Sequence, residues 1–183
     1  MKKLLLTLLL PLSIISSASY GEEINSLFGI TLYGNAENYV SSNYIASNKV
    51  ENQETIEGFF DLGITDDIKT KSPYITNYWI SIDDNNTIHE IYGENELINL
   101  DICKAVKEYL SSKREEKYQI DMEYSETPYA SFKIYSYYYY DNENDYFTIQ
   151  CKETFGTTLV YLQIYTSSIA LGVAKDEYYE SGL

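Results

Sequence analysis

The segment from Asp101 to Tyr118, DICKAVKEYLSSKREEKY, constrains the fold more than any other part of the chain. Its apolar side chains recur at the spacing of one helical face, at Ile102, Val106, Tyr109 and Leu110. Asp101 suits the N-cap position, and the cations Lys113, Arg114 and Lys117 suit the negative end of the helix dipole. The pattern predicts one long central helix.

Strand-like stretches flank this helix on both sides. A short helix is predicted at 36–42, and strands are predicted at 55–64, 74–82, 87–92, 129–140, 145–152 and 157–166. The DDNN turn at 83–86 indicates a hairpin. The predicted fold class is α+β, with antiparallel sheet(s), one long central helix packed on a face, and the order short α-β-β-β-α-β-β-β. A helix followed by three strands occurs twice, which raises the hypothesis of a duplicated unit, although no residue-level repeat supports it.

The first 18 residues have the pattern of a bacterial secretory signal peptide. Lys2 and Lys3 precede an apolar run at 4–10, and small residues follow at 16–18. The alternative is a buried N-terminal helix. The predicted organisation is a signal peptide at 1–18 and a single α+β domain at 19–183, whose last ~15 residues form a frayed helix or a tail. The predicted location is the periplasm or the medium. No later stretch approaches the roughly 18 apolar residues of a membrane span, so stable membrane insertion after cleavage is not expected.

Cys103 and Cys151 are the only two cysteines. In a chain exported to an oxidising compartment, they are expected to form a disulfide between the central helix and a later strand. Closing a loop of that length contributes about 4 kcal/mol in the chain-entropy account. The alternative is two separately buried thiols.

The charge of the chain limits the classes of partner. The formal net charge is −15, and removal of residues 1–18 takes away two lysines and no acid, which lowers it to about −17. Such a surface repels nucleic acid and anionic lipid, so neither is an expected partner. It suits a cationic partner, divalent ions, or solubility alone.

Tyrosine is unusually abundant, with 21 in the chain, and the stretch 135–140 is its densest part. Alternation along a strand sends these side chains to both faces of a sheet. One set, Tyr135, Tyr137 and Tyr139, is a candidate binding face for a protein, a peptide or a glycan. The alternative is that these rings pack under the helix.

Catalytic and metal-binding patterns are absent from the sequence. His89 is the sole histidine and lies within a predicted strand, and no nucleophile elbow, P-loop or HExxH motif occurs. The acidic run at 141–145 begins like an EF-hand loop, but Tyr146 and Lys152 occupy the positions that require Gly and Glu, so an acidic hairpin turn is the simpler interpretation. No catalytic residue, metal or cofactor is predicted, and a non-enzymatic role is favoured while activity is left open.

Three stretches carry a resemblance: LFGITLYGNAENYV at 27–40, YWISIDDNNTIHEIYG at 78–93 and DICKAVKEYL at 101–110. Together they resemble a group of uncharacterised bacterial secreted proteins with an LFGI-type entry and a cysteine at the head of the central helix. The architecture is also similar to that of small envelope proteins of the BamE/SmpA kind, although this chain lacks their lipid-anchor cysteine. The resemblance implies a fold and brings no catalytic residues.

The function expected from the sequence is a secreted or periplasmic, non-enzymatic binding domain of unknown ligand. It would use either the tyrosine-rich sheet face or the acidic surface. One form of this hypothesis is an inhibitor or immunity-like protein that meets a basic enzyme. The alternative, from a different class, is a carboxylate-dependent hydrolase acting on envelope polymers, which requires a cleft with two converging acids.

Overall fold

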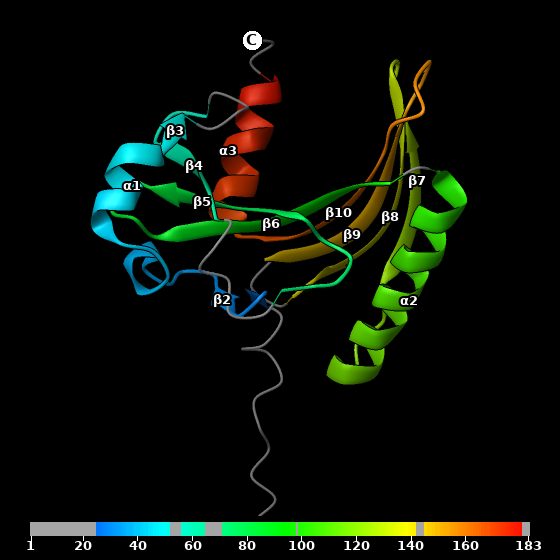
Figure 1. The fold of residues 1–183 in the computed structure, drawn as a ribbon, viewed down its shortest axis with the longest axis horizontal. Helices are drawn as coiled ribbons and strands as arrows, with labels where there is room; N and C mark the ends of the chain where they lie inside the picture. The colour runs from blue at the N-terminus through cyan, green and yellow to red at the C-terminus, as the bar shows by residue number, and fades with distance from the viewer. Residues whose placement is uncertain (1–24, 52–55, 65–70, 98, 142–144, 181–183) are drawn as a thin grey trace, which may run out of the picture.

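The computed structural model describes residues 25–51, 56–64, 71–97, 99–141 and 145–180, and it has an α+β fold built on a large antiparallel sheet (Figure 1). The first half contains β1 Ser26–Leu27, β2 Ile30–Thr31, the 3-10 turn Ala36–Asn38, α1 Ser42–Asn48, β3 Val50–Glu51, β4 Phe59–Gly63, β5 Asn77–Asp83 and β6 Ile88–Leu97. The second half contains α2 Leu100–Tyr118, β7 Glu123–Pro128, β8 Phe132–Tyr140, β9 Tyr146–Thr154, β10 Val160–Ser167 and α3 Ile169–Glu180.

The sheet has eight strands in the order β3-β4-β5-β6-β10-β9-β8-β7, and β1 and β2 form a separate two-stranded sheet. Each half of the large sheet is a four-stranded meander, and the two meanders meet where β6 pairs with β10. The predicted α+β class is confirmed, but α1 and α2 are each followed by four strands of this sheet instead of three, and α3 follows the last strand. β7, whose side chains are nearly all exposed, was missed because it lacks alternating apolar positions.

The two faces of the sheet differ in chemistry. The face toward α2 carries the apolar core, which includes Leu62, Ile80, Ile91, Ile149 and Ile164. Successive strand residues point to opposite faces, so the positions between these carry the polar and aromatic side chains of the other face. The sheet is curved, and α2 lies along its convex side while α3 stands on its concave side (Figure 1).

A disulfide between Cys103 and Cys151 joins α2 to β9, with the two Sγ atoms 2.10 Å apart. The structure thus brings together the two cysteines that the sequence predicted to pair. Both are fully buried. The helix begins one residue before the predicted N-cap, because the side chain of Asn99, and not that of Asp101, accepts from the Ile102 amide.

The orientation of α2 corrects the predicted apolar stripe. Ile102 and Tyr109 are 41% and 50% exposed, whereas Cys103, Lys107 and Ser111 are buried. Only the remaining members of the predicted stripe, Val106 and Leu110, pack against the core. The buried positions recur every four residues from the disulfide-linked cysteine. The helix therefore turns the face with the disulfide toward the sheet, and not the face with the most apolar side chains.

Cations on α2 contact aromatic rings of the strands beneath. The Lys107 side chain is only 1% exposed, and its Nζ lies 4.5 Å from the ring centres of both Tyr124 and Tyr137. Burial is the main cause that lowers the pKa of Lys107. The Arg114 guanidinium lies 3.6 Å from the ring centre of Phe147. Cation–π attraction thus replaces part of the apolar contact that a helix normally makes with a sheet.

The segment before β3 covers the rest of the core face. Asn35 caps the 3-10 turn as predicted, but the helix predicted at 36–42 is that short turn followed by α1, which Ser41 caps. β1 and β2 are joined by Phe28 and Gly29, both with positive φ, and the Phe28 ring packs edge-on against Tyr78.

Several other sequence predictions fall at the ends of elements or outside the described residues. The predicted signal peptide lies outside them, as do Thr55, the start of one predicted strand, and 142–144 of the acidic turn. The C-terminal segment predicted as a frayed helix or a tail contains α3. None of the helices in the described ranges is long and apolar enough to cross a membrane.

We expect Gly93→Ala in β6 to destabilise the domain by about 1–3 kcal/mol, the usual cost of overpacking a core. A Cβ atom at Gly93 would lie 2.7 Å from the Phe28 ring and 2.9 Å from Ile75. Chemical denaturation measures the change. Gly63→Ala is the matched control, because its Cβ would meet Trp79 at an ordinary 3.6 Å. Equal stabilities of the two variants would contradict this packing.

We expect the double variant Cys103→Ala/Cys151→Ala to lose about 2–5 kcal/mol of unfolding free energy relative to the oxidised protein. The bond closes a loop across 48 residues of sequence separation, and both positions are buried. Urea denaturation of the wild type with and without reductant provides the comparison. If reductant destabilises the wild type and the double variant alike, the loss does not come from the bond.

Candidate functional site

The concave face of the sheet is organised in rows of side chains that face one another across neighbouring strands. Cross-strand pairing aligns Trp79, Tyr92 and Tyr165 in one row on β5, β6 and β10. The adjacent row contains Glu94, Gln163 and Gln150 on β6, β10 and β9. Among the described residues, α3 is the only helix that stands on this side of the sheet (Figure 1).

Aromatic rings form a continuous line across this face. The ring centres of Trp79 and Tyr92 are 5.4 Å apart, and the line continues at 5.7–6.2 Å through Tyr165, Tyr146 and Tyr140, and from there to Tyr138 at 5.8 Å. Three of these pairs are directly opposed on neighbouring antiparallel strands, whereas Tyr146 lies diagonally from Tyr165 and Tyr138 lies two residues from Tyr140 on the same strand. The rings are partly exposed, and Tyr140 is 59% exposed. We call these six residues the aromatic row.

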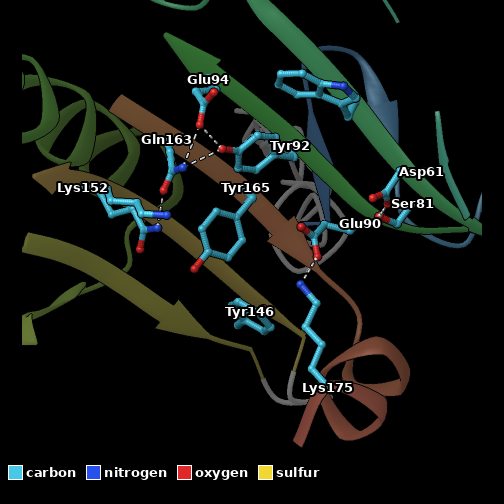
Figure 2. Close-up of a pocket in the computed structure, with 12 residues that line it drawn as sticks. Asp61, Ser81, Glu90, Tyr92, Glu94, Tyr146, Lys152, Gln163, Tyr165 and Lys175 are labelled. Carbon is cyan, nitrogen blue, oxygen red and sulfur yellow. Dashed lines mark hydrogen bonds and ion pairs between the residues drawn. The ribbon is translucent and has the colours of Figure 1, made fainter. Parts of the chain in front are cut away.

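A hydrogen-bonded chain of polar groups lies beside the aromatic row (Figure 2). Gln150 donates to the Oε1 atom of Gln163 at 2.7 Å, and Gln163 donates both to the Tyr92 hydroxyl at 2.7 Å and to Glu94 Oε2 at 2.8 Å. The Tyr92 hydroxyl donates in turn to Glu94 Oε2 at 2.5 Å. The chain of donors therefore starts at Gln150 and ends at the Glu94 carboxylate.

Three further polar contacts involve acids that line the same cavity, whose volume is about 400 Å³. Lys175 of α3 lies 3.0 Å from Glu90 Oε2 (Figure 2), and Ser167 donates to the same oxygen at 3.3 Å. On the other side, Ser81 donates to Asp61 at 2.6 Å. The volume lies within the range of small-ligand pockets.

Three tyrosines of this face, Tyr92, Tyr146 and Tyr165, have a raised pKa. Burial and the hydrogen bond to Glu94 raise the pKa of Tyr92 far above its ordinary value. Burial and the nearby Glu90 charge likewise raise the pKa of Tyr146, and they raise the pKa of Tyr165 to about 12. These hydroxyls therefore remain protonated hydrogen-bonding groups throughout the physiological range.

The structure corrects the candidate binding face predicted from the sequence. Tyr135, Tyr137 and Tyr139 lie on the side of β8 that faces α2 and the core. Tyr135 is 6% exposed, and Lys104 lies 3.8 Å above its ring. Alternation places Tyr138 and Tyr140 on the concave face instead. Sequence reasoning found the tyrosine-rich strand, but the structure packs the set that it chose against the core.

His89 lies between an acid and a serine. Its Nδ1 is 3.0 Å from Ser168 Oγ, and its Nε2 is 3.4 Å from Asp83 Oδ2. Ser168 is fully buried, and its Oγ caps α3 by accepting from the Leu171 amide. A nucleophile must be reachable by substrate, so this array joins the β5–β6 hairpin to the start of α3 and is not a catalytic triad.

The part of the chain that the structure describes contains no group of three His, Cys, Asp or Glu side chains arranged to hold a metal ion. The acids that a hydrolase would use are Asp61, Glu90 and Glu94, and all three line the concave cavity. Glu90 and Glu94 are four residues apart on one strand, which separates their backbones by about 13 Å. Sequence reasoning noted the abundance of acids but singled out no pair.

No known protein family matches this chain, and neither a curated protein nor a solved structure shows significant similarity to it. The resemblances noted from the sequence therefore stay predictions.

We expect Asp83→Asn to make the domain less stable at neutral pH, by an amount that shrinks as the pH falls below about 4. Burial opposes the charge, but hydrogen bonds from the Thr87 and Asn85 amides and from His89 keep the pKa of Asp83 below its ordinary value. This carboxylate therefore stabilises the fold above the unfolded-state pKa, and its contribution is lost as the pH falls through the folded-state pKa.

Urea denaturation of the wild type and the variant between pH 2.5 and 7, a range that spans the ordinary carboxyl pKa, measures this difference. Asp121→Asn, at an exposed site after α2, is the control for the loss of one acid. A wild-type advantage over Asp83→Asn that stays constant with pH would contradict the assignment.

Proposed function

We propose that this domain binds a protein partner through the concave face of its sheet. The observation that carries the proposal is the aromatic row, six partly exposed rings in mutual contact across five strands. Tyr and Trp supply large contact areas at little cost in conformational entropy, and they are enriched among the residues that dominate binding energy.

The dimensions and charge of the face support a protein as the ligand. The polar and aromatic positions extend from Asp61 on β4 to Tyr138 on β8, six adjacent strands and about 24 Å. That width suits a folded partner or an extended peptide more than a single small molecule. The net charge of −15 favours a partner with a basic surface, because opposite charges raise the rate of association.

The proposal includes export of the protein. The buried disulfide and the absence of a membrane-spanning helix among the described residues are compatible with a secreted or periplasmic location. The signal peptide that the sequence predicts would direct the chain there.

The hydrolase alternative would use the acids of the same cavity. Glu94 accepts from Tyr92 and Gln163, and Glu90 is ion-paired with Lys175. Both side chains are thus held in contacts within the protein, and their backbones lie about 13 Å apart on one strand, whereas glycoside hydrolysis needs two carboxyl groups about 5–10 Å apart on either side of the bond. We therefore rank binding above hydrolysis.

The test is site-specific photo-crosslinking in the secretome or envelope of the source cells. A photoreactive phenylalanine analogue replaces Tyr140 of the aromatic row in one protein and Tyr109 of α2 in another, since both side chains are at least half exposed. We expect one basic protein to be crosslinked from position 140 and not from position 109. Excess unlabelled wild type should compete, and raised salt should weaken capture.

The purified partner then allows a quantitative measurement. Tyr165→Ala should weaken its binding by about tenfold or more, as for a typical hot-spot residue. Tyr109→Ala on α2 should leave it unchanged, and thermal melting confirms that both variants fold. Equal crosslinking from the two positions, or retention on glycans with no protein crosslinked, would overturn the proposal of a protein partner.

A further inference from the structure

The cavity in the concave face presents hydrogen-bond acceptors. Gln150 donates to Gln163, and Gln163 donates to Glu94 Oε2. Two acceptor oxygens therefore receive no hydrogen bond within this chain: the Gln150 carbonyl oxygen at one end and Glu94 Oε1 at the other. No described residue donates to either of these oxygens. The Gln150 side chain is only 9% exposed and lines the cavity. Neither oxygen is among the buried polar atoms that lack a partner in the described residues, so both are open to the cavity, where water or a ligand can donate to them.

The two lysines that border the cavity do not satisfy these acceptors. Lys175 places its Nζ 3.0 Å from Glu90, at the α3 side of the cavity (Figure 2). The Nζ of Lys152 lies 4.6 Å from the ring centre of Phe132. Among the described residues, the side chains that donate to Glu94 are Tyr92 and Gln163, and both are neutral.

Aromatic rings line the cavity beside Glu94. Trp79, Tyr92 and Tyr165 all border it, and the Trp79 and Tyr92 rings are tilted by 45° to each other. Ring faces attract cations, and Trp and Tyr attract them most strongly. A group that fits this cavity should therefore be positively charged, should carry donors and no acceptors, and should be flat enough to lie against a ring.

We propose that the cavity formed by Trp79, Tyr92, Glu94 and Gln150 is the subsite that receives an arginine side chain of the protein partner. The guanidinium group is planar, carries five donors and no acceptor, and stacks on aromatic rings while it binds a carboxylate. This inference rests on the proposed function and adds a property of the partner. The partner inserts an arginine between the aromatic row and Glu94.

Trp79 is the only tryptophan of the chain, so its fluorescence reports directly on the cavity. The probe is N-acetyl-arginine amide, and the matched neutral probe is N-acetyl-citrulline amide, which has nearly the same shape. We expect saturable changes in fluorescence and heat with the arginine probe in the millimolar range, and binding about tenfold weaker or worse with citrulline.

Glu94→Gln should weaken the arginine probe by about tenfold, because it removes the charge and keeps the shape of the side chain. Glu108→Gln, on the exposed side of α2, changes the net charge equally and should have no effect. The unfolding midpoints of both variants show whether they fold. Binding of citrulline as tight as arginine, no loss in Glu94→Gln, or neither heat nor fluorescence change would overturn the inference.

The two proposals fail in different ways. If crosslinking from position 140 persists while the arginine probe does not bind, the arginine subsite is wrong and the protein-binding face stands. If the arginine probe binds selectively but no protein is crosslinked from position 140, the cation preference of the cavity stands and the protein partner is wrong.

Discussion

The disulfide between Cys103 and Cys151 anchors α2 on the face of the sheet that carries the apolar core, and the arrangement of both faces follows from that contact. It fixes α2 against β9, so every β9 side chain with the same alternation as Cys151 faces the helix. Cross-strand pairing extends this alternation to the neighbouring strands. The intervening positions, which include Gln150 and Lys152, consequently face the concave side and build the cavity.

The same constraint explains the unusual underside of α2. Rotation of the helix about its covalent attachment brings Lys107 and Ser111 toward the sheet, and the tyrosines of β7 and β8 make a lysine acceptable there. Their rings supply an apolar surface and also an attraction for the ammonium group, which offsets part of the cost of its burial. Tyr135 and Tyr137 are therefore structural, while Tyr138 and Tyr140 of the same strand remain available to a partner.

The side chains of the concave face hold one another in place through their contacts. Its rings contact one another across strands, and its amide and carboxylate groups are tied in sequence from β9 through β10 to β6. Side chains already held in one arrangement lose little conformational freedom when a partner binds. The side chains of this face are therefore both partly exposed and pre-organised for binding, unlike polar side chains that move freely in solvent.

By itself, the sequence determined the α+β class, the long central helix, the hairpin of β5 and β6, and the pairing of the two cysteines. These features follow from local periodicity, turn residues and the scarcity of cysteine. Only the tertiary structure decided the rotation of α2, the joining of two meanders through β6 and β10, and the face on which each tyrosine lies. Alternation divides a strand into two sets of side chains, but only contact with another element shows which set is buried. The concave site depends on register between strands far apart in sequence, such as Glu94 opposite Gln163, and no local pattern contains that information.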